Sequence, residues 1–205
     1  MNENRPQTRI QKRNTTAIIN AALEVFSQHG FRGATLDQIA SAAGLSKPNL
    51  LYYFPSKEAI HIELLSGLME TWLAPLHALN ANGDPIQEIV DYVLRKLEMA
   101  RDLPRESRLF ANEIVQGAPR ILDQIEGPLR VLVDEKSALI QTWIDEGEIV
   151  PYDPHHLIFS IWSTTQHYAD FDAQIRGIIR QDGDAHFADA AGFLAQFYRT
   201  ALTPS

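Results

Sequence analysis

Hydrophobic residues recur every three or four positions through most of this chain, the spacing that gathers them on one face of an α-helix. Between residues 15 and 29, one such stripe consists of Ile18, Ile19, Ala22, Val25 and Phe26. No segment alternates convincingly between apolar and polar residues, as a half-buried β-strand does. The pattern predicts an all-α protein of about nine helices, with three short helices first.

Capping residues and helix breakers divide this pattern into elements. Thr35 with Gln38 three positions later has the spacing of a capping box, in which each residue satisfies a free N–H of the other. Ser46 is an N-cap, and Pro48 follows in the first turn, where its missing N–H costs little. Helices are therefore predicted over residues 15–29, 36–43, 47–53, 57–73, 86–101, 106–116, 129–146, about twenty residues from 155, and 185–201.

Two of the short helices meet at the tight turn Ala43-Gly44-Leu45. Two helices joined by a short turn containing glycine form a helix-turn-helix, whose second helix enters the major groove of DNA. On that second helix, Leu50 and Leu51 are expected to point inward. The polar side chains left to reach phosphates and base edges are those of Lys47, Asn49, Tyr52 and Tyr53.

The charge distribution supports a polyanionic partner at the N-terminal end. The chain of 205 residues has a formal net charge of −8, yet residues 1–60 contain seven Lys and Arg against four acidic residues, a balance of +3. The remainder therefore carries −11. Such asymmetry suggests that the basic part meets nucleic acid, although a solvated surface gives the same count. The basic residues from Arg5 to Arg13 form an N-terminal tail that either contacts a groove of the DNA or is disordered.

Composition excludes several other classes of protein. The sequence contains no cysteine, which rules out disulfides, thiol catalysis and cysteine-ligated metals. It has no secretory signal and no apolar stretch that would cross a bilayer, so a cytoplasmic protein without a membrane partner is expected. His155 and His156 point about 100° apart on a helix and are poorly placed to bind one metal ion. His167 and Asp170 lack any catalytic framework, so we expect no enzyme activity, no metal and no cofactor.

Three motifs then follow one another at a fixed spacing. They are F-x-x-x-G-F-x-x-x-T over 26–35, I-A-x-x-A-G-L-S over 39–46 and L-Y-Y-F-P-S-K-E over 51–58. In this order they resemble the signature of TetR-family transcription regulators. Further stretches at 72–76, 107–110, 134–140 and 153–171 resemble the members of that family that control pyrimidine utilisation.

The resemblance implies a homodimer that binds double-stranded DNA at a pseudo-palindromic operator. Residues 1–54 would form the DNA-binding domain, and residues 55–205 would bind an effector and dimerise through the two C-terminal helices. The implied function is repression of pyrimidine catabolism genes, with release from the operator by a pyrimidine such as uracil or thymine. A TetR-type regulator that responds to a different small molecule is the alternative.

The resemblance also extends the set of expected DNA contacts. Thr35 and Ser46 are N-caps first, and their place in a DNA-binding domain gives them a second role at phosphates. Lys57 opens a helix N-terminus, where free N–H groups favour a phosphate, although a solvated lysine explains it too. The full set of expected DNA contacts is Thr35, Ser46, Lys47, Pro48, Asn49, Tyr52, Tyr53 and Lys57.

Two aromatic residues and a glutamine are the candidates for effector binding. Trp162 and Gln166 lie four positions apart and therefore share one helix face. The pattern alone favours a core tryptophan beside an interfacial glutamine, whereas the resemblance implies that this helix lines the effector site. Trp72 either walls that site or packs against the remainder of the domain.

Overall fold

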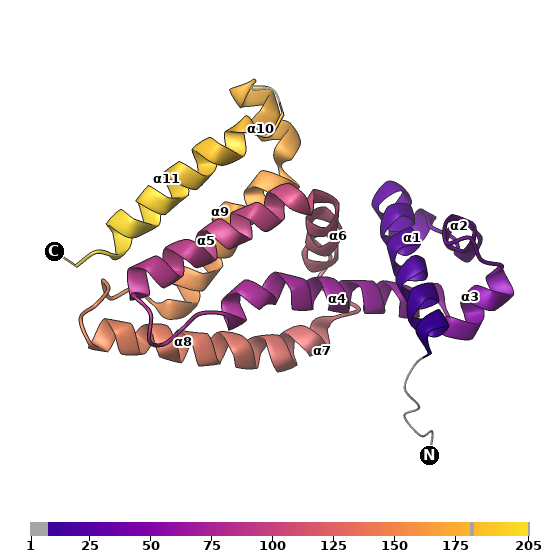
Figure 1. Ribbon diagram of the computed structural model, residues 1–205, viewed down its shortest axis with the longest axis horizontal. Coiled ribbons are helices and arrows are strands. Elements are labelled where there is room, and N and C mark those ends of the chain that lie inside the picture. The colour runs from indigo at the N-terminus through magenta and orange to yellow at the C-terminus, as the bar shows by residue number, and fades with distance from the viewer. Residues whose placement is uncertain (1–7, 181–182, 205) are drawn as a thin grey trace, which may run out of the picture. The chain divides into compact units, whose positions relative to one another are not determined.

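The computed structural model describes residues 8–180 and 183–204, and within these ranges every regular element is a helix. The chain order can be followed in Figure 1. The elements are α1 (Arg9–Gly33), α2 (Leu36–Ala42), α3 (Lys47–Tyr53), α4 (Lys57–His77), α5 (Pro85–Asp102), α6 (Pro104–Val115), α7 (Leu122–Gln124), the π-helical turn η1 (Ile125–Leu129), α8 (Arg130–Asp145), α9 (Pro154–Asp170), α10 (Asp172–Ile179) and α11 (Ala185–Leu202). The expected all-α fold is confirmed.

The chain divides into two compact units, Met1–Leu68 and Met69–Ser205, which we call the head and the body. The head extends past residue 54 because the first turns of α4 belong to it. His61 of α4 is buried, and its ring lies 4.7 Å from that of Phe26 and 4.9 Å from that of Phe31, centroid to centroid. The assignment of DNA binding to residues 1–54 and of effector binding to 55–205 stays a prediction.

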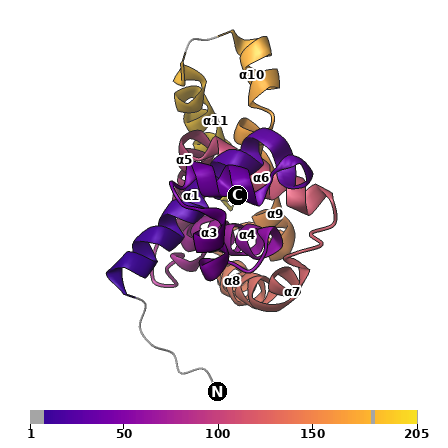
Figure 2. The same ribbon diagram turned by 90° about the vertical axis from the view of Figure 1, so that its right-hand side faces the viewer.

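The short helices of the head are built by their caps, as the sequence predicts. The Thr35 hydroxyl accepts the N–H of Gln38 at 3.2 Å, and the Gln38 side chain accepts the N–H of Thr35 at 2.8 Å. The Ser46 hydroxyl accepts the N–H of Asn49 at 3.3 Å. Between α2 and α3, Gly44 has a φ of 69°, a conformation that glycine adopts without strain. These caps fix where α2 and α3 begin. Figure 1 labels both helices beside α1, and Figure 2 shows α1 and α3 from the side.

Helix α1 is longer at both ends than the predicted segment 15–29. It begins at Arg9 because Thr8 and Gln11 form a capping box that the sequence analysis did not use. Arg9, Lys12 and Arg13 are therefore helical, whereas Arg5 lies outside the described residues. Gly30, the predicted stop, does interrupt the helix with a φ of 65°, but one further turn follows it.

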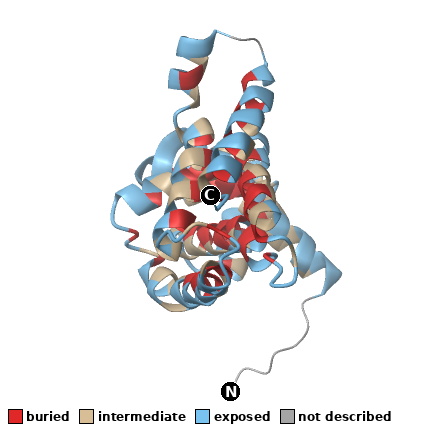
Figure 3. Ribbon diagram, turned by 90° about the vertical axis from the view of Figure 1, so that its left-hand side faces the viewer, coloured by how far each residue is buried: buried red, intermediate tan, exposed pale blue. Residues whose placement is uncertain are grey.

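The body surrounds a core in which α5 and α9 are central. Helix α5 packs on both α9 and α11, and α9 also contacts α6 and α8. Buried residues face inward on these helices and exposed residues face outward, as Figure 3 shows. The largest fully buried side chains of the body include Tyr92, Trp143 and Tyr198.

Two helices of the body differ from their predicted bounds. The segment before residue 129 forms α7 and then η1, in which Pro128 lacks the N–H of a regular α-helical bond. The predicted helix of about twenty residues from 155 breaks at Phe171 into α9 and α10. No proline or glycine marks that break. Its physical cause is the neighbouring α6, which binds the end of α9 through polar contacts described below.

In the described part of the chain, no helix combines the length and the apolarity that a membrane span requires.

Candidate functional site

Helix α3 presents a polar face to solvent. Its buried contact is Leu50, whereas Lys47, Pro48 and Asn49 are exposed and Tyr52 is 71% exposed. The expectation that Leu51 also points inward is wrong, because this side chain is 39% exposed. Successive residues of a helix point about 100° apart, so Leu51 turns away from the face on which Leu50 is buried. The exposed side chains of α3 remain accessible to a partner.

Lys47 is available to an anionic partner. Its ammonium lies 2.9 Å from a carboxylate oxygen of Asp37 in α2, and both side chains are exposed. An exposed ion pair contributes only about 0–1 kcal/mol. Exchanging the carboxylate of Asp37 for a phosphate therefore costs little.

The two tyrosines of α3 have different environments. The hydroxyl of Tyr53 accepts a hydrogen bond from the side-chain amide of Asn14 at 2.8 Å, which attaches α3 to α1. The ring of Tyr52 rests edge-on against that of Tyr53, 5.1 Å between centroids, and remains open to solvent. Tyr52 is thus open to a partner, and Tyr53 holds the helix in position.

Lys57 is bound inside the head more closely than the sequence suggests. Its ammonium donates to the carbonyl oxygens of Phe31 at 2.6 Å and Ala34 at 2.7 Å, and lies 4.6 Å from the centre of the Phe31 ring. These carbonyls end α1 and precede the cap of α2. An ammonium has three N–H donors, so one remains for a phosphate.

A second group of polar residues lies inside the body, around α5. Trp162 of α9 donates its indole N–H to the hydroxyl of Tyr92, at 2.6 Å. One turn further along α5, the ammonium of Lys96 lies 3.5 Å from the carbonyl oxygen of Trp72 and 5.6 Å from the centre of its ring. Trp72 is 6% exposed, and Gln166 is half-buried. The structure therefore brings α4 and α9 to the same stretch of α5.

The end of α9 is held by α6. The Ser107 hydroxyl donates to the Asp170 carboxylate at 2.7 Å, and the Arg108 guanidinium donates to the carbonyl oxygen of Ala169 at 3.2 Å. Ser107 is fully buried. These contacts satisfy the last turn of α9, which explains why the helix ends there.

Burial changes the acid–base behaviour of this group. It lowers the pKa of Lys96 to about 7, although the nearby charge of Asp170 offsets part of that change. Burial raises the pKa of the Asp170 carboxyl, against the effect of the hydrogen bond from Ser107. Burial also raises the pKa of Tyr92, so its phenol remains neutral at physiological pH.

Lys96 and Tyr92 are the residues of this group that sequence reasoning missed. A signal was present, because residues 89, 92, 93, 96, 97 and 100 form the buried stripe of α5 and position 96 of that stripe is a lysine. Lysine is almost never fully buried without a functional or electrostatic reason. A charged residue at a core position of an amphipathic helix is thus the clue.

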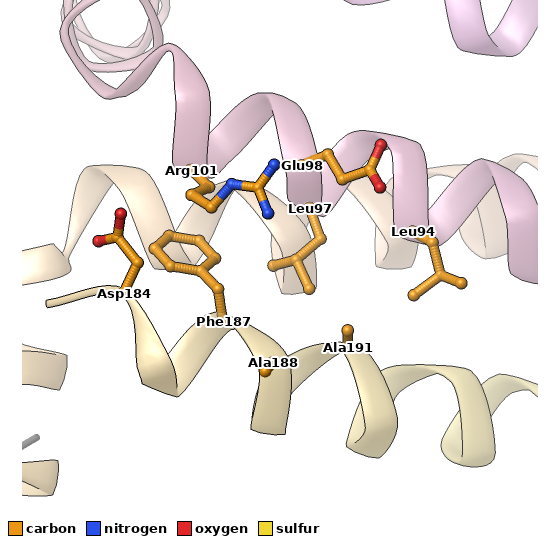
Figure 4. Close-up of a pocket in the computed structure, with 8 residues that line it drawn as sticks. All are labelled: Leu94, Leu97, Glu98, Arg101, Asp184, Phe187, Ala188 and Ala191. Atoms are coloured by element: carbon orange, nitrogen blue, oxygen red, sulfur yellow. The ribbon is translucent and has the colours of Figure 1, made fainter.

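A separate groove of about 290 Å³ lies between α5 and α11, and Figure 4 shows the residues that line it. Its floor is apolar, with Leu97 and Phe187 buried beneath it. At its rim, the Arg101 guanidinium already binds Asp102, at 2.7 and 3.2 Å. The groove contains none of the residues that the sequence analysis connects with an effector.

Comparison with known proteins decides the family. Residues 18–64 match the sequence model of bacterial regulatory proteins of the tetR family, and residues 65–205 match that of the C-terminal region of YcdC-like proteins. The chain belongs to the TetR family of transcription regulators. Regulators of this family bind operator DNA and small-molecule effectors, and they are dimeric. The predicted family and its helix-turn-helix are confirmed.

Among curated relatives, this TetR-family chain is 52% identical over 162 residues to the HTH-type transcriptional regulator RutR of Escherichia coli K12. The match covers 79% of this chain and 76% of that relative. The fold is shared with a TetR-like transcriptional regulator from Rhodococcus sp. RHA1, with a TM-score of 0.67 and 17% identity over 95% of this chain and 96% of that one. GusR of Salmonella enterica gives a TM-score of 0.65 and 17% identity over 92% and 95% of the two chains.

Proposed function

We propose that this TetR-family chain represses genes of pyrimidine catabolism and leaves its operator when a small pyrimidine, such as uracil or thymine, binds to the body. The observation that supports the proposal is that Trp72 and Trp162 both contact α5, through Lys96 and Tyr92, while Gln166 is half-buried one turn after Trp162 on α9. The identity to RutR supports it, because the match spans most of both chains.

Operator recognition is assigned to the exposed face of the helix-turn-helix. Asn49 and Tyr52 stand on the outer face of α3 and reach base edges or phosphates, while Lys47 exchanges Asp37 for a phosphate. Thr35 and Ser46 cap α2 and α3, and Pro48 keeps the first turn of α3 close to the backbone of the DNA. Tyr53 positions α3 through Asn14, and the remaining N–H of Lys57 is directed to a phosphate. The contacts of one head cover only a few base pairs, so specificity requires two heads on a pseudo-palindromic site.

The dimer is proposed to form through α9 and α11. Phe159 of α9 and the stacked pair Phe193 and Phe197 of α11 are exposed, each by 46% or more. The hydroxyl of Tyr198 on α11 lies 3.1 Å from that of Ser160 on α9, which fixes the two helices side by side. Exposed aromatic residues on adjacent helices are typical of a surface that a partner covers. Two such surfaces would make a four-helix interface.

Effector recognition is assigned to Gln166 and Trp162. Uracil and thymine present an imide edge, an N–H between two carbonyl groups, and a side-chain amide matches it with one acceptor and one donor. The hydrogen bond from Trp162 to Tyr92 fixes the plane of the indole ring, so that it can lie against a flat heterocycle without further ordering. Trp72 closes the site from α4.

Release follows as a shift between two conformations. The effector favours the body conformation in which the two heads no longer match the spacing of the operator half-sites. The factor by which the effector lowers the affinity of the protein for its operator equals the factor by which the operator lowers the affinity of the protein for the effector.

Thermal unfolding tests the effector assignment. Uracil and thymine are expected to raise the melting temperature of the purified chain, by an amount that grows with the logarithm of ligand concentration, because they bind the folded state alone. Cytosine, whose edge reverses a donor and an acceptor, serves as the matched control and should raise it far less. If all three pyrimidines leave the melting temperature unchanged, the effector is a different small molecule and only the operator-binding part of the proposal stands.

A further inference from the structure

Lys96 is a buried lysine whose ammonium makes only a long hydrogen bond. The side chain is 3% exposed, and the carbonyl oxygen of Trp72 is 3.5 Å away, at the long end of the hydrogen-bond range. An ammonium has three donors and is costly to bury without strong partners. A body that needed only a packed core would place an apolar residue at this position.

The arrangement of α5 and α9 places this ammonium beside the proposed effector residues. On α9, Trp162, Gln166 and Asp170 are four positions apart and form one stripe. Trp162 binds Tyr92 of α5, and the charge of Asp170 acts on Lys96, one turn beyond Tyr92. Because α5 and α9 run alongside each other between these two contacts, Gln166 lies level with the turn from Tyr92 to Lys96.

We propose that Lys96 is a specificity-determining residue of the effector site, whose ammonium donates a hydrogen bond to a carbonyl oxygen of the ligand held by Gln166. This inference rests on the proposed function. It restricts the ligand to a small ring with an acceptor oxygen next to the edge that the glutamine amide binds. Trp72, whose ring already faces the ammonium, forms one wall of the same site.

The inference has a consequence for pH. Burial holds the pKa of Lys96 near 7, and a carbonyl oxygen accepts from the protonated amine alone, so the ligand must raise this pKa and binding must take up a proton at neutral pH. Effector affinity should therefore be greatest below pH 7 and fall as pH rises through 7. For a group that titrates near 7, the protonated fraction at pH 8 is about one tenth of that at pH 6, which predicts about tenfold weaker binding.

The charged groups around Lys96 come from two helices. Asp170 of α9 favours the protonated amine, and Arg108 of α6 and His167 of α9 act on Asp170 in turn. The residue that α4 contributes at this point, Trp72, does not titrate. Ionisation of Asp170 at higher pH favours the protonated amine of Lys96. It therefore opposes the loss of effector affinity that deprotonation of Lys96 causes.

Calorimetric titration of the full chain with uracil and thymine at pH 6, 7 and 8, in two buffers of different ionisation enthalpy, tests the inference. The wild type should take up protons on binding at pH 7 and lose about tenfold in affinity at pH 8. Lys96→Met should bind about 10- to 100-fold more weakly at pH 6 and lose the proton uptake. Lys136→Met, which replaces another buried lysine of the body on α8, is the matched control and should behave as the wild type.

Each result decides one claim. If the wild type binds a pyrimidine without proton uptake and Lys96→Met binds it equally well, Lys96 is not in the site and the proposed function still stands. If the wild type binds neither pyrimidine, the proposed function and this inference both fail. Should Lys96→Met not fold, Lys96→Gln keeps a donor without the charge, and it must retain binding while losing the pH dependence; pH dependence unchanged in Lys96→Gln overturns the inference.

Discussion

The head and the body of this TetR-family chain place their polar side chains in opposite ways. In the head, Lys47, Asn49 and Tyr52 are exposed on α3, a short helix whose buried residue is Leu50. In the body, Lys96 and Ser107 are buried among large apolar residues. The charge balance differs as well, with +3 on residues 1–60 and −11 on the remainder.

Under the proposed function, the difference reflects the size and charge of the two ligands, operator DNA and a small pyrimidine. A DNA duplex is a large polyanion, so the surface that binds it needs exposed, exchangeable cations and a rigid helix. A small neutral ring offers few hydrogen bonds. These bonds distinguish one ring from another strongly only in a site shielded from water, where a wrong ring would leave a buried donor or acceptor without a partner. Mutations in the two regions should therefore change different measured quantities.

The largest difference between the effect on effector affinity and the effect on operator affinity is expected from Gln166→Ala. Removing an amide that makes two hydrogen bonds to the effector should cost about 1–3 kcal/mol, or roughly 5- to 150-fold in effector affinity. Operator affinity of the ligand-free protein should stay nearly unchanged, because the substitution lies in the body. Calorimetry with uracil and electrophoretic mobility shifts with operator DNA measure the two quantities.

Gln141→Ala is the control for that experiment, since Gln141 is an exposed glutamine on α8 that binds Asp145 at 2.8 Å. It should alter neither affinity. Equal uracil affinity in Gln166→Ala and the wild type would remove Gln166 from the effector site.

A smaller effect, with the opposite selectivity, is expected from Lys57→Ala. If each protomer loses one phosphate contact, the slope of log affinity against log salt should flatten by up to about two units for the dimer, since each neutralised phosphate contributes about 0.9. Effector affinity should not change. Operator titrations between low and moderate salt give the slope, and Lys47→Ala provides the comparison with an exposed lysine.

The geometry of Lys57 makes the result of that titration informative in both directions. The side chain also holds the carbonyl oxygens of Phe31 and Ala34, so affinity should fall at every salt concentration. A lower affinity with an unchanged slope would mean that Lys57 positions the helix-turn-helix and does not meet a phosphate.

The same contrast explains what the sequence could predict. The caps at Thr35 and Ser46 join residues three positions apart, so the spacing of these residues in the sequence is enough to predict the contact. The pairs that build the body site are distant in the chain: Tyr92 and Trp162 are 70 positions apart, and Ser107 and Asp170 are 63 positions apart. The break at Phe171 in the helix predicted from residue 155 lies beside such a distant pair, Ser107 and Asp170, and no local signal marks it.

The all-α fold and the order of the helices could be predicted from the sequence, whereas the contact partners of the buried polar side chains could not. Trp162 and Gln166 could be assigned to one face of a helix from their spacing alone. That Tyr92 orients the indole and that an ammonium lies a turn away follow only from the packing of α5 against α9.

Operator release by an effector tests the central claim most directly. An operator fragment is first identified from the DNA that the protein binds in cells, and it is then labelled with a fluorophore. The fluorescence anisotropy of its complex with the protein is followed while uracil, thymine or cytosine is added. The account predicts that uracil or thymine releases the wild-type protein, that cytosine at the same concentration does not, and that Gln166→Ala needs roughly 5- to 150-fold more ligand for the same release. An operator complex that stays intact at uracil and thymine concentrations that saturate the free protein would contradict it.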